Sequence, residues 1–250
     1  MSSRTSALAA AICVSLGIAS VSPRHVAAEA QPVRQVGRAG QVRQVGAIIS
    51  MASAQTAGVS PAVLDLALRA VNCAVKSGAV ALPPTLTLID YSLPSITPRL
   101  WVFDLESGRL LFRELVAHGK NTGDNLAQHF SDLMNSRESS IGLFRTADTY
   151  VGNNGYSLRL DGLEPGFNSH ARERAIVVHG ASYVSDAFAA AQGRLGRSWG
   201  CPALRTAIAQ KVIDTIRGGG VVFSYYPDAT WLKTSRFLNC GAATDVVATN

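Results

Sequence analysis

A cysteine with the surroundings of a nucleophile stands in the segment GRLGRSWGCPAL, residues 193–204. An apolar stripe at helical spacing follows it, from Leu204 to Ile216, and Pro202 suits the first position of a helix. We therefore expect Cys201 at or beside a helix N-cap, where backbone N–H groups and the helix dipole favour a thiolate. The preceding glycines allow a tight turn whose N–H groups could bind an oxyanion. A small buried residue in a turn is the alternative interpretation of this cysteine.

A histidine that could activate this thiol ends the short apolar segment AIVV. His179 precedes Gly180 there, so a strand would present its imidazole at a sheet edge. His118, in the sequence LVAHG, has a parallel setting but lies further from Cys201 in the chain. We expect a Cys–His pair in which His179 ranks ahead of His118 as the base.

The elements that would position these residues are mostly strands. β-branched or alternating segments predict strands at 85–91, 100–105, 110–117, 175–178 and 221–226. Turn residues predict hairpins at Glu106–Gly108 and at Asn154-Gly155. Apolar residues at helical spacing predict helices at 61–77, 126–135, 185–192 and after Pro202. Strands and helices do not alternate, so the expected fold class is mainly β with a few helices (α+β) and an N-terminal helical segment.

The chain divides into a leader, a linker and a folded part. Residues 1–30 have the pattern of a secretory signal peptide: Arg4, the apolar run 7–21, and an Ala-x-Ala cleavage site ending at Ala30. Residues 31–58 read as a flexible basic linker, 59–84 as a helical segment, 85–227 as the catalytic domain and 228–250 as a tail. We expect an exported protein of the periplasm or cell envelope, with no transmembrane segment after cleavage.

The formal net charge of +6 is mildly basic, and the linker holds arginines but no acidic residue. For an exported chain, an anionic envelope surface or cell-wall polymer is the expected partner rather than nucleic acid; a solvated linker without a partner is the alternative.

Three cysteines follow the leader, an odd number for an oxidising compartment. If Cys73 and Cys240 form a disulfide, Cys201 is the free thiol; the sequence alone leaves this pairing open. No metal-ligand spacing, phosphate loop or dinucleotide fingerprint occurs, so we expect neither a metal nor a cofactor.

The run His179-Gly180 followed by Ser198-Trp199-Gly200-Cys201 resembles the signature of the L,D-transpeptidases. The upstream segments HGKNTG and SSIGLFRT are similar to early strand and loop regions of that family, in its murein L,D-transpeptidase catalytic domain (YkuD-like) branch. The resemblance spans about residues 101–226. The chain departs from the family at Trp199, where many members have a second histidine, and at Pro202 and Ala203, where they carry an arginine.

The resemblance implies a β-sandwich catalytic domain with Cys201 as nucleophile and His179 as its acid/base partner. The Gly180 carbonyl would orient the imidazole, and backbone N–H groups of the segment from Ser198 to Cys201, those of Trp199 and Gly200 included, would hold the oxyanion. Further substrate contacts would come from His118, Lys120, Tyr183, Arg197 and Arg205.

The implied substrate is the tetrapeptide stem of peptidoglycan. Cys201 would attack the carbonyl of its third residue, release D-alanine and form a thioester, which an amine of a neighbouring stem would resolve into a cross-link. Carbapenems, which acylate this family, would then target the thiol.

The sequence leaves three alternative functions to consider. With water as the acceptor, the enzyme would be an L,D-carboxypeptidase. With an inert cysteine, the chain would be a non-catalytic peptidoglycan-binding module. A serine hydrolase using Ser182 or Ser198 is disfavoured, because no G-x-S-x-G elbow is present.

Overall fold

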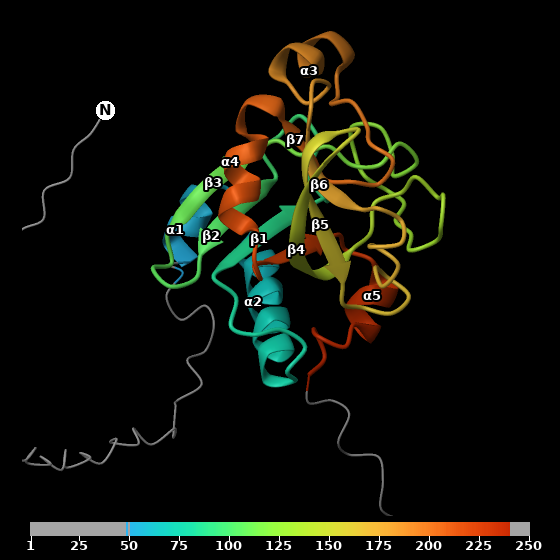
Figure 1. Ribbon diagram of the computed structural model, residues 1–250. Coiled ribbons are helices and arrows are strands. Elements are labelled where there is room, and N and C mark those ends of the chain that lie inside the picture. Colours follow the sequence, from blue (N-terminus) through green and yellow to red (C-terminus); the bar gives the residue numbers. More distant parts are fainter. Residues whose placement is uncertain (1–48, 50, 241–250) are drawn as a thin grey trace, which may run out of the picture. The chain divides into compact units, whose positions relative to one another are not determined.

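The computed structural model describes residues 49 and 51–240 (Figure 1). The expected leader, the linker up to residue 48, and residues 241–250 of the expected tail lie outside this range. Among the residues that the structure describes, no helix is long and apolar enough to cross a membrane.

Eight strands form one mixed sheet in the order β3-β2-β1-β8-β4-β5-β6-β7, which confirms the mainly β expectation. The strands are β1 (Thr85–Asp90), β2 (Leu100–Asp104), β3 (Leu110–Glu114), β4 (Gly142–Gly152), β5 (Gly155–Gly162), β6 (Val177–Ala181), β7 (Ala203–Arg205) and β8 (Val221–Tyr225). Both predicted hairpins are present, because β2 pairs antiparallel with β3 and β4 with β5. β1 and β8 pair in parallel at the centre.

The two edges of this sheet nearly meet. Ala117 follows the edge strand β3, and its N–H donates to the carbonyl of Ala203 in the other edge strand, β7, at 2.9 Å. The sheet is therefore close to a barrel, with a few helices around it. This closure brings the segment after β3 against the segment that carries Cys201.

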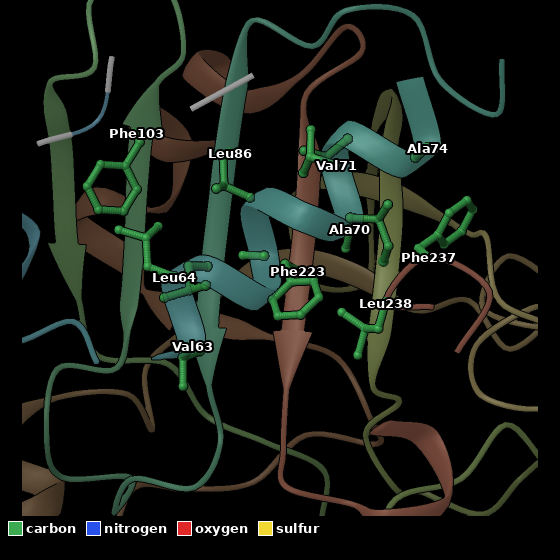
Figure 2. Packing of buried hydrophobic residues seen from close by; sticks show 14 of the residues in the cluster. Val63, Leu64, Ala70, Val71, Ala74, Leu86, Phe103, Phe223, Phe237 and Leu238 are labelled. Carbon is green, nitrogen blue, oxygen red and sulfur yellow. The ribbon is translucent and has the colours of Figure 1, made fainter. Parts of the chain in front are cut away.

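Two helices cover opposite faces of the sheet. Figure 2 shows Leu64 and Val71 of α2 (Pro61–Lys76) packed near Leu86 of β1 and Phe223 of β8. On the other face, buried residues of α4 (Thr206–Ile216) pack in a second cluster that includes Val222. Alternate residues of one strand thus enter different clusters, as expected for a sheet covered on both sides. The predicted helix at 61–77 is confirmed, with Pro61 in its first turn.

The predicted helix over 126–135 is wrong. The segment has no helix, and Asn135 and Arg137 adopt left-handed φ angles of 60° and 57°. Three of its spaced apolar residues do not face a core, since Leu126, Leu133 and Met134 are exposed. The helix predicted over 185–192 is present as α3 (Asp186–Gln192), whose N-cap hydroxyl Ser185 accepts from the Phe188 N–H.

The ends of the described chain are more ordered than expected. Residues 51–56 of the expected flexible linker form α1 (Met51–Thr56), and Ile49 and Val59 are buried in the core. In the expected tail, α5 (Ala229–Thr234) buries Trp231 against the same cluster. Burial of these apolar side chains stabilises the ordered segments and opposes the loss of chain entropy.

Candidate active site

Cys201 lies between a loop and β7, not at a helix terminus. The expectation that it caps a helix is wrong: α4 begins only at Thr206 and its N-cap is Arg205. Ala203 pairs with both Ala117 and His179, and these strand contacts hold the residues after Pro202 in an extended conformation. The helix dipole therefore does not activate this thiol.

The Cys201 thiol is buried, with 7% of the residue exposed. Its Sγ accepts from the Val177 N–H at 3.5 Å and donates to the carbonyl of Ala175 at 3.6 Å. Burial raises the pKa of the thiol, and the Val177 N–H and the positive charge of Arg174 oppose that shift. The resting sulfur is therefore protonated at neutral pH and needs a base to become nucleophilic.

His179 is placed by β6 with one ring nitrogen bonded to the backbone. Its Nδ1 lies 2.9 Å from the Gly180 carbonyl oxygen, the contact that the resemblance implies. A carbonyl oxygen only accepts, so Nδ1 carries the proton and Nε2 of the neutral ring has a free lone pair. Burial lowers the pKa of His179, which keeps the ring neutral. The imidazole is thus ready to accept a proton at Nε2.

One cavity of about 470 Å³ is lined by both Cys201 and His179. The parallel register of β6 and β7 pairs His179 with Ala203, two residues after the cysteine. Four further residues from the sequence analysis line this cavity: Tyr183, Arg197, Ser198 and Trp199. The hairpin turn at Asn153 and Asn154 also borders it. The structure therefore gathers most of the expected site around one opening.

The loop before Cys201 is held by its own hydroxyl group. Ser198 Oγ donates to the Cys201 carbonyl at 2.6 Å and accepts from the Gly200 N–H at 3.1 Å. The Gly200 N–H, expected at the oxyanion, is thus bonded within the loop in this structure. Trp199 is 72% exposed, and the guanidinium of Arg137 lies 4.9 Å from its ring centroid.

Arg174 is a site residue that the sequence analysis missed. Its side chain is only 4% exposed, yet it lines the cavity beside Cys201. Its guanidinium donates to the carbonyls of Ser131 and Glu138, at 2.5 and 2.6 Å, and to two serine hydroxyls of the same loop. An arginine directly before the short apolar segment AIVV carries no signal of this role, because its partners lie more than thirty positions upstream.

Three expected substrate contacts lie elsewhere. His118 is buried, with Nδ1 2.7 Å from Nη2 of Arg99, and does not line the cavity. Arg205 makes a two-point ion pair with Glu114, with the shortest distance 2.7 Å. Lys120 lines a separate open cavity, which shares Arg197 with the first.

Cys73 of α2 and Cys240 are joined by a disulfide in the structure, 167 positions apart in sequence. Among the described residues, Cys201 is the free cysteine. The thiol that lines the cavity is therefore the one left unpaired.

Comparison with known proteins gives a match to a family model. Residues 55–225 match the model of the L,D-transpeptidase catalytic domain. No curated protein matches the sequence.

Several solved L,D-transpeptidase structures are similar at low identity. The enzyme from Mycobacterium smegmatis is 15% identical (TM-score 0.37; 57% of this chain and 59% of that chain covered). L,D-transpeptidase 1 of Mycobacterium tuberculosis is 16% identical (TM-score 0.33; 57% and 62%). The enzyme from Stackebrandtia nassauensis is 16% identical (TM-score 0.35; 73% and 78%). The matched region thus spans less than two thirds of either mycobacterial structure.

The family match begins within α1, includes α2, and ends with the last residue of β8, so it contains both Cys201 and His179. It extends over more than half of the chain. The chain therefore belongs to the L,D-transpeptidase catalytic domain family.

Proposed function

We propose that this chain is an exported peptidoglycan L,D-transpeptidase that uses Cys201 as its nucleophile and His179 as its acid/base partner. The observation that carries the proposal is the shared cavity. A buried free thiol lines it, and so does an imidazole whose tautomer leaves Nε2 free to accept a proton. This is the arrangement that activates a cysteine without a pre-formed thiolate.

The first half-reaction forms a thioester. As Cys201 Sγ attacks the carbonyl carbon of the third residue of a tetrapeptide stem, the thiol proton passes to His179 Nε2. The oxyanion of the tetrahedral intermediate is held by backbone N–H groups. When the intermediate collapses, the C–N bond to D-alanine breaks and His179 returns the proton to the departing amine.

The second half-reaction releases the enzyme. An amine of a neighbouring stem gives a proton to His179 as its nitrogen attacks the thioester carbonyl. The C–S bond then breaks, the sulfur regains the proton, and a cross-link remains between the two stems. If water attacks instead, the product is a trimmed stem and the enzyme is an L,D-carboxypeptidase.

The leader pattern in residues 1–30 supports export to the periplasm or cell envelope, where peptidoglycan is found. We expect no metal or cofactor to take part, since both half-reactions need only the thiol, the imidazole and backbone donors.

The test is the intact mass of the chain from residue 31 after mixing with a carbapenem. We expect one covalent adduct per chain, absent in Cys201→Ala. Digestion of tetrapeptide stems with and without an amine donor then separates cross-linking from trimming.

The opposite result is also informative. If a folded protein with reduced Cys201 forms no adduct and releases no D-alanine, the thiol is inert. The catalytic proposal is then wrong, and the alternative of a non-catalytic peptidoglycan-binding module is favoured.

A further inference from the structure

We propose that Ser139 is a positioning residue that aims the backbone N–H of Cys201 at the oxyanion. The inference rests on the proposed function, because it concerns the intermediate that Cys201 forms. Ser139 lies in the loop before β4, more than sixty positions upstream of the cysteine, and it is buried.

The Ser139 hydroxyl joins two segments that are distant in sequence. Its Oγ donates to the Gly200 carbonyl at 3.0 Å and accepts from the Gly119 N–H at 3.0 Å. The Ser139 N–H in turn donates to Thr122 Oγ1 at 2.7 Å. Both the backbone and the side chain of Ser139 are thus bonded, which leaves its hydroxyl little freedom to move.

The hydrogen bond from Ser139 to the Gly200 carbonyl also sets the direction of the Cys201 N–H. The Gly200 carbonyl and the Cys201 N–H belong to the same planar trans peptide, so they point in opposite directions. With the carbonyl directed at Ser139, the Cys201 N–H is directed away from it. Within the described part of the chain, no acceptor is bonded to this N–H, so it is available to a ligand in the cavity that Cys201 lines.

The hydroxyl of Ser198 forms hydrogen bonds with the two neighbouring peptide units. Ser198 Oγ accepts from the Gly200 N–H and donates to the Cys201 carbonyl. The Gly200 N–H is thus bonded within the loop, whereas the N–H of Cys201, the residue that carries the reacting sulfur, is left to the oxyanion. Ser139 thus bonds the peptide between Gly200 and Cys201, and Ser198 bonds the peptide units on either side of it.

Close packing prevents this loop from relaxing. A Cβ on Gly119 would lie 2.4 Å from the Arg137 carbonyl oxygen and 3.0 Å from Gly200 Cα. A Cβ on Gly200, whose φ is +121°, would lie 2.7 Å from the Glu138 carbonyl oxygen. These contacts require glycine at both positions, so Ser139 holds a peptide already confined by its neighbours.

The test compares two reactions of the same thiol in Ser139→Ala. Acylation by a carbapenem passes through an oxyanion, whereas alkylation by iodoacetamide does not. We expect the first-order acylation rate constant at saturating carbapenem to fall about 10-fold to 100-fold, the range for a weakened oxyanion donor. The half-saturating concentration and the alkylation rate should stay near those of the unaltered chain.

Two further variants make the comparison specific. Ser139→Thr keeps the hydroxyl and should restore acylation. Ser224→Ala is the matched control, because Ser224 is also buried and its Oγ donates to a carbonyl of the same loop, that of Ser140, at 2.9 Å. If Ser139→Ala does not fold, Ser139→Cys keeps the shape with a weaker donor and should lower acylation but not alkylation of Cys201, which peptide mass mapping separates from alkylation of the new thiol.

Equal losses of acylation and alkylation would show a merely structural role and overturn the inference, as would unchanged acylation in Ser139→Ala. An unaltered chain that forms no adduct at all is a different result. It contradicts the proposed function itself.

Discussion

At the scale of single residues, burial sets the resting state of the proposed catalytic pair. Desolvation disfavours the charged form of each group, so it raises the pKa of the Cys201 thiol and lowers that of the His179 imidazole. The proton therefore rests on sulfur and both groups are neutral. A thiolate–imidazolium pair would need the opposite shifts, so the proposed mechanism has His179 take the proton during the attack.

This assignment predicts the pH dependence of acylation. Protonated His179 cannot accept the thiol proton, so the rate should rise with pH through an apparent pKa below the usual imidazole value of about 6.5. The acylation rate should not change with pH around neutral pH. The measurement is the carbapenem acylation rate between pH 4 and 8.

The variant His179→Ala should lose this acid limb and react about 100-fold to 10,000-fold more slowly. An apparent pKa above 6.5 for the acid side of the pH–rate profile would contradict the assignment. So would an acid side that persists in His179→Ala.

At the scale of elements, the segment after β3 is anchored by a buried basic pair. Arg99 is fully buried and donates to the carbonyls of Val116 and Leu93 as well as to His118 Nδ1. Burial, aided by the charge of Arg99, lowers the pKa of His118 to about 4. The segment that bridges to β7 at Ala117 therefore requires a neutral imidazole next to it.

We expect this imidazole to make the fold sensitive to acid. Unfolded His118 binds a proton near pH 6.5, whereas the folded ring stays neutral down to about pH 4. The unfolded state thus binds more protons within this window, so stability falls as the pH is lowered through it. The loss from this one group is about 3 kcal/mol at pH 4.

Urea unfolding of the unaltered chain and of His118→Asn at pH 7 and pH 4 measures this contribution. The asparagine retains an acceptor for Arg99 but does not titrate, so the variant should lose less stability between the two values. Equal losses in both proteins would show that His118 is not the source.

At the scale of the whole described molecule, both ends of the described range pack into the core of the sheet. The disulfide between Cys73 and Cys240 ties α2 to the segment after α5. The buried Glu164 carboxylate accepts from Trp231 Nε1 at 3.0 Å and from Ser235 Oγ at 2.5 Å, which fixes α5 and its C-terminal end. The core thus includes segments that the sequence analysis treated as separate.

The double variant Cys73→Ser, Cys240→Ser should lower the free energy of unfolding by about 2–5 kcal/mol, because the disulfide closes a long loop in the unfolded chain. Carbapenem acylation of the folded variant at 25 °C should persist, since neither cysteine lines the cavity. Denaturant unfolding measures the loss of stability, with Cys201→Ser as the matched cysteine control. Equal stability of the double variant and the unaltered chain would contradict the prediction.

Short-range patterns predicted much of the fold. The hairpins at 106–108 and 154–155 and the helix from Pro61 follow from turn residues and from the spacing of apolar residues a few positions apart. The helix at 126–135 was wrong, since helical spacing there coincides with exposed side chains and loop contacts. The start of α4 was misplaced, because the pairing of Ala203 with two other segments is a long-range contact.

The sequence by itself determined the mainly β class and singled out Cys201 and His179 as candidates. Residue type and local periodicity carry that information within short windows. Only the tertiary structure decided that both side chains line one cavity, that Arg174 and Ser139 support the loop, and that the resting pair is neutral. Burial and hydrogen bonding between distant segments set these properties, and no local pattern encodes them.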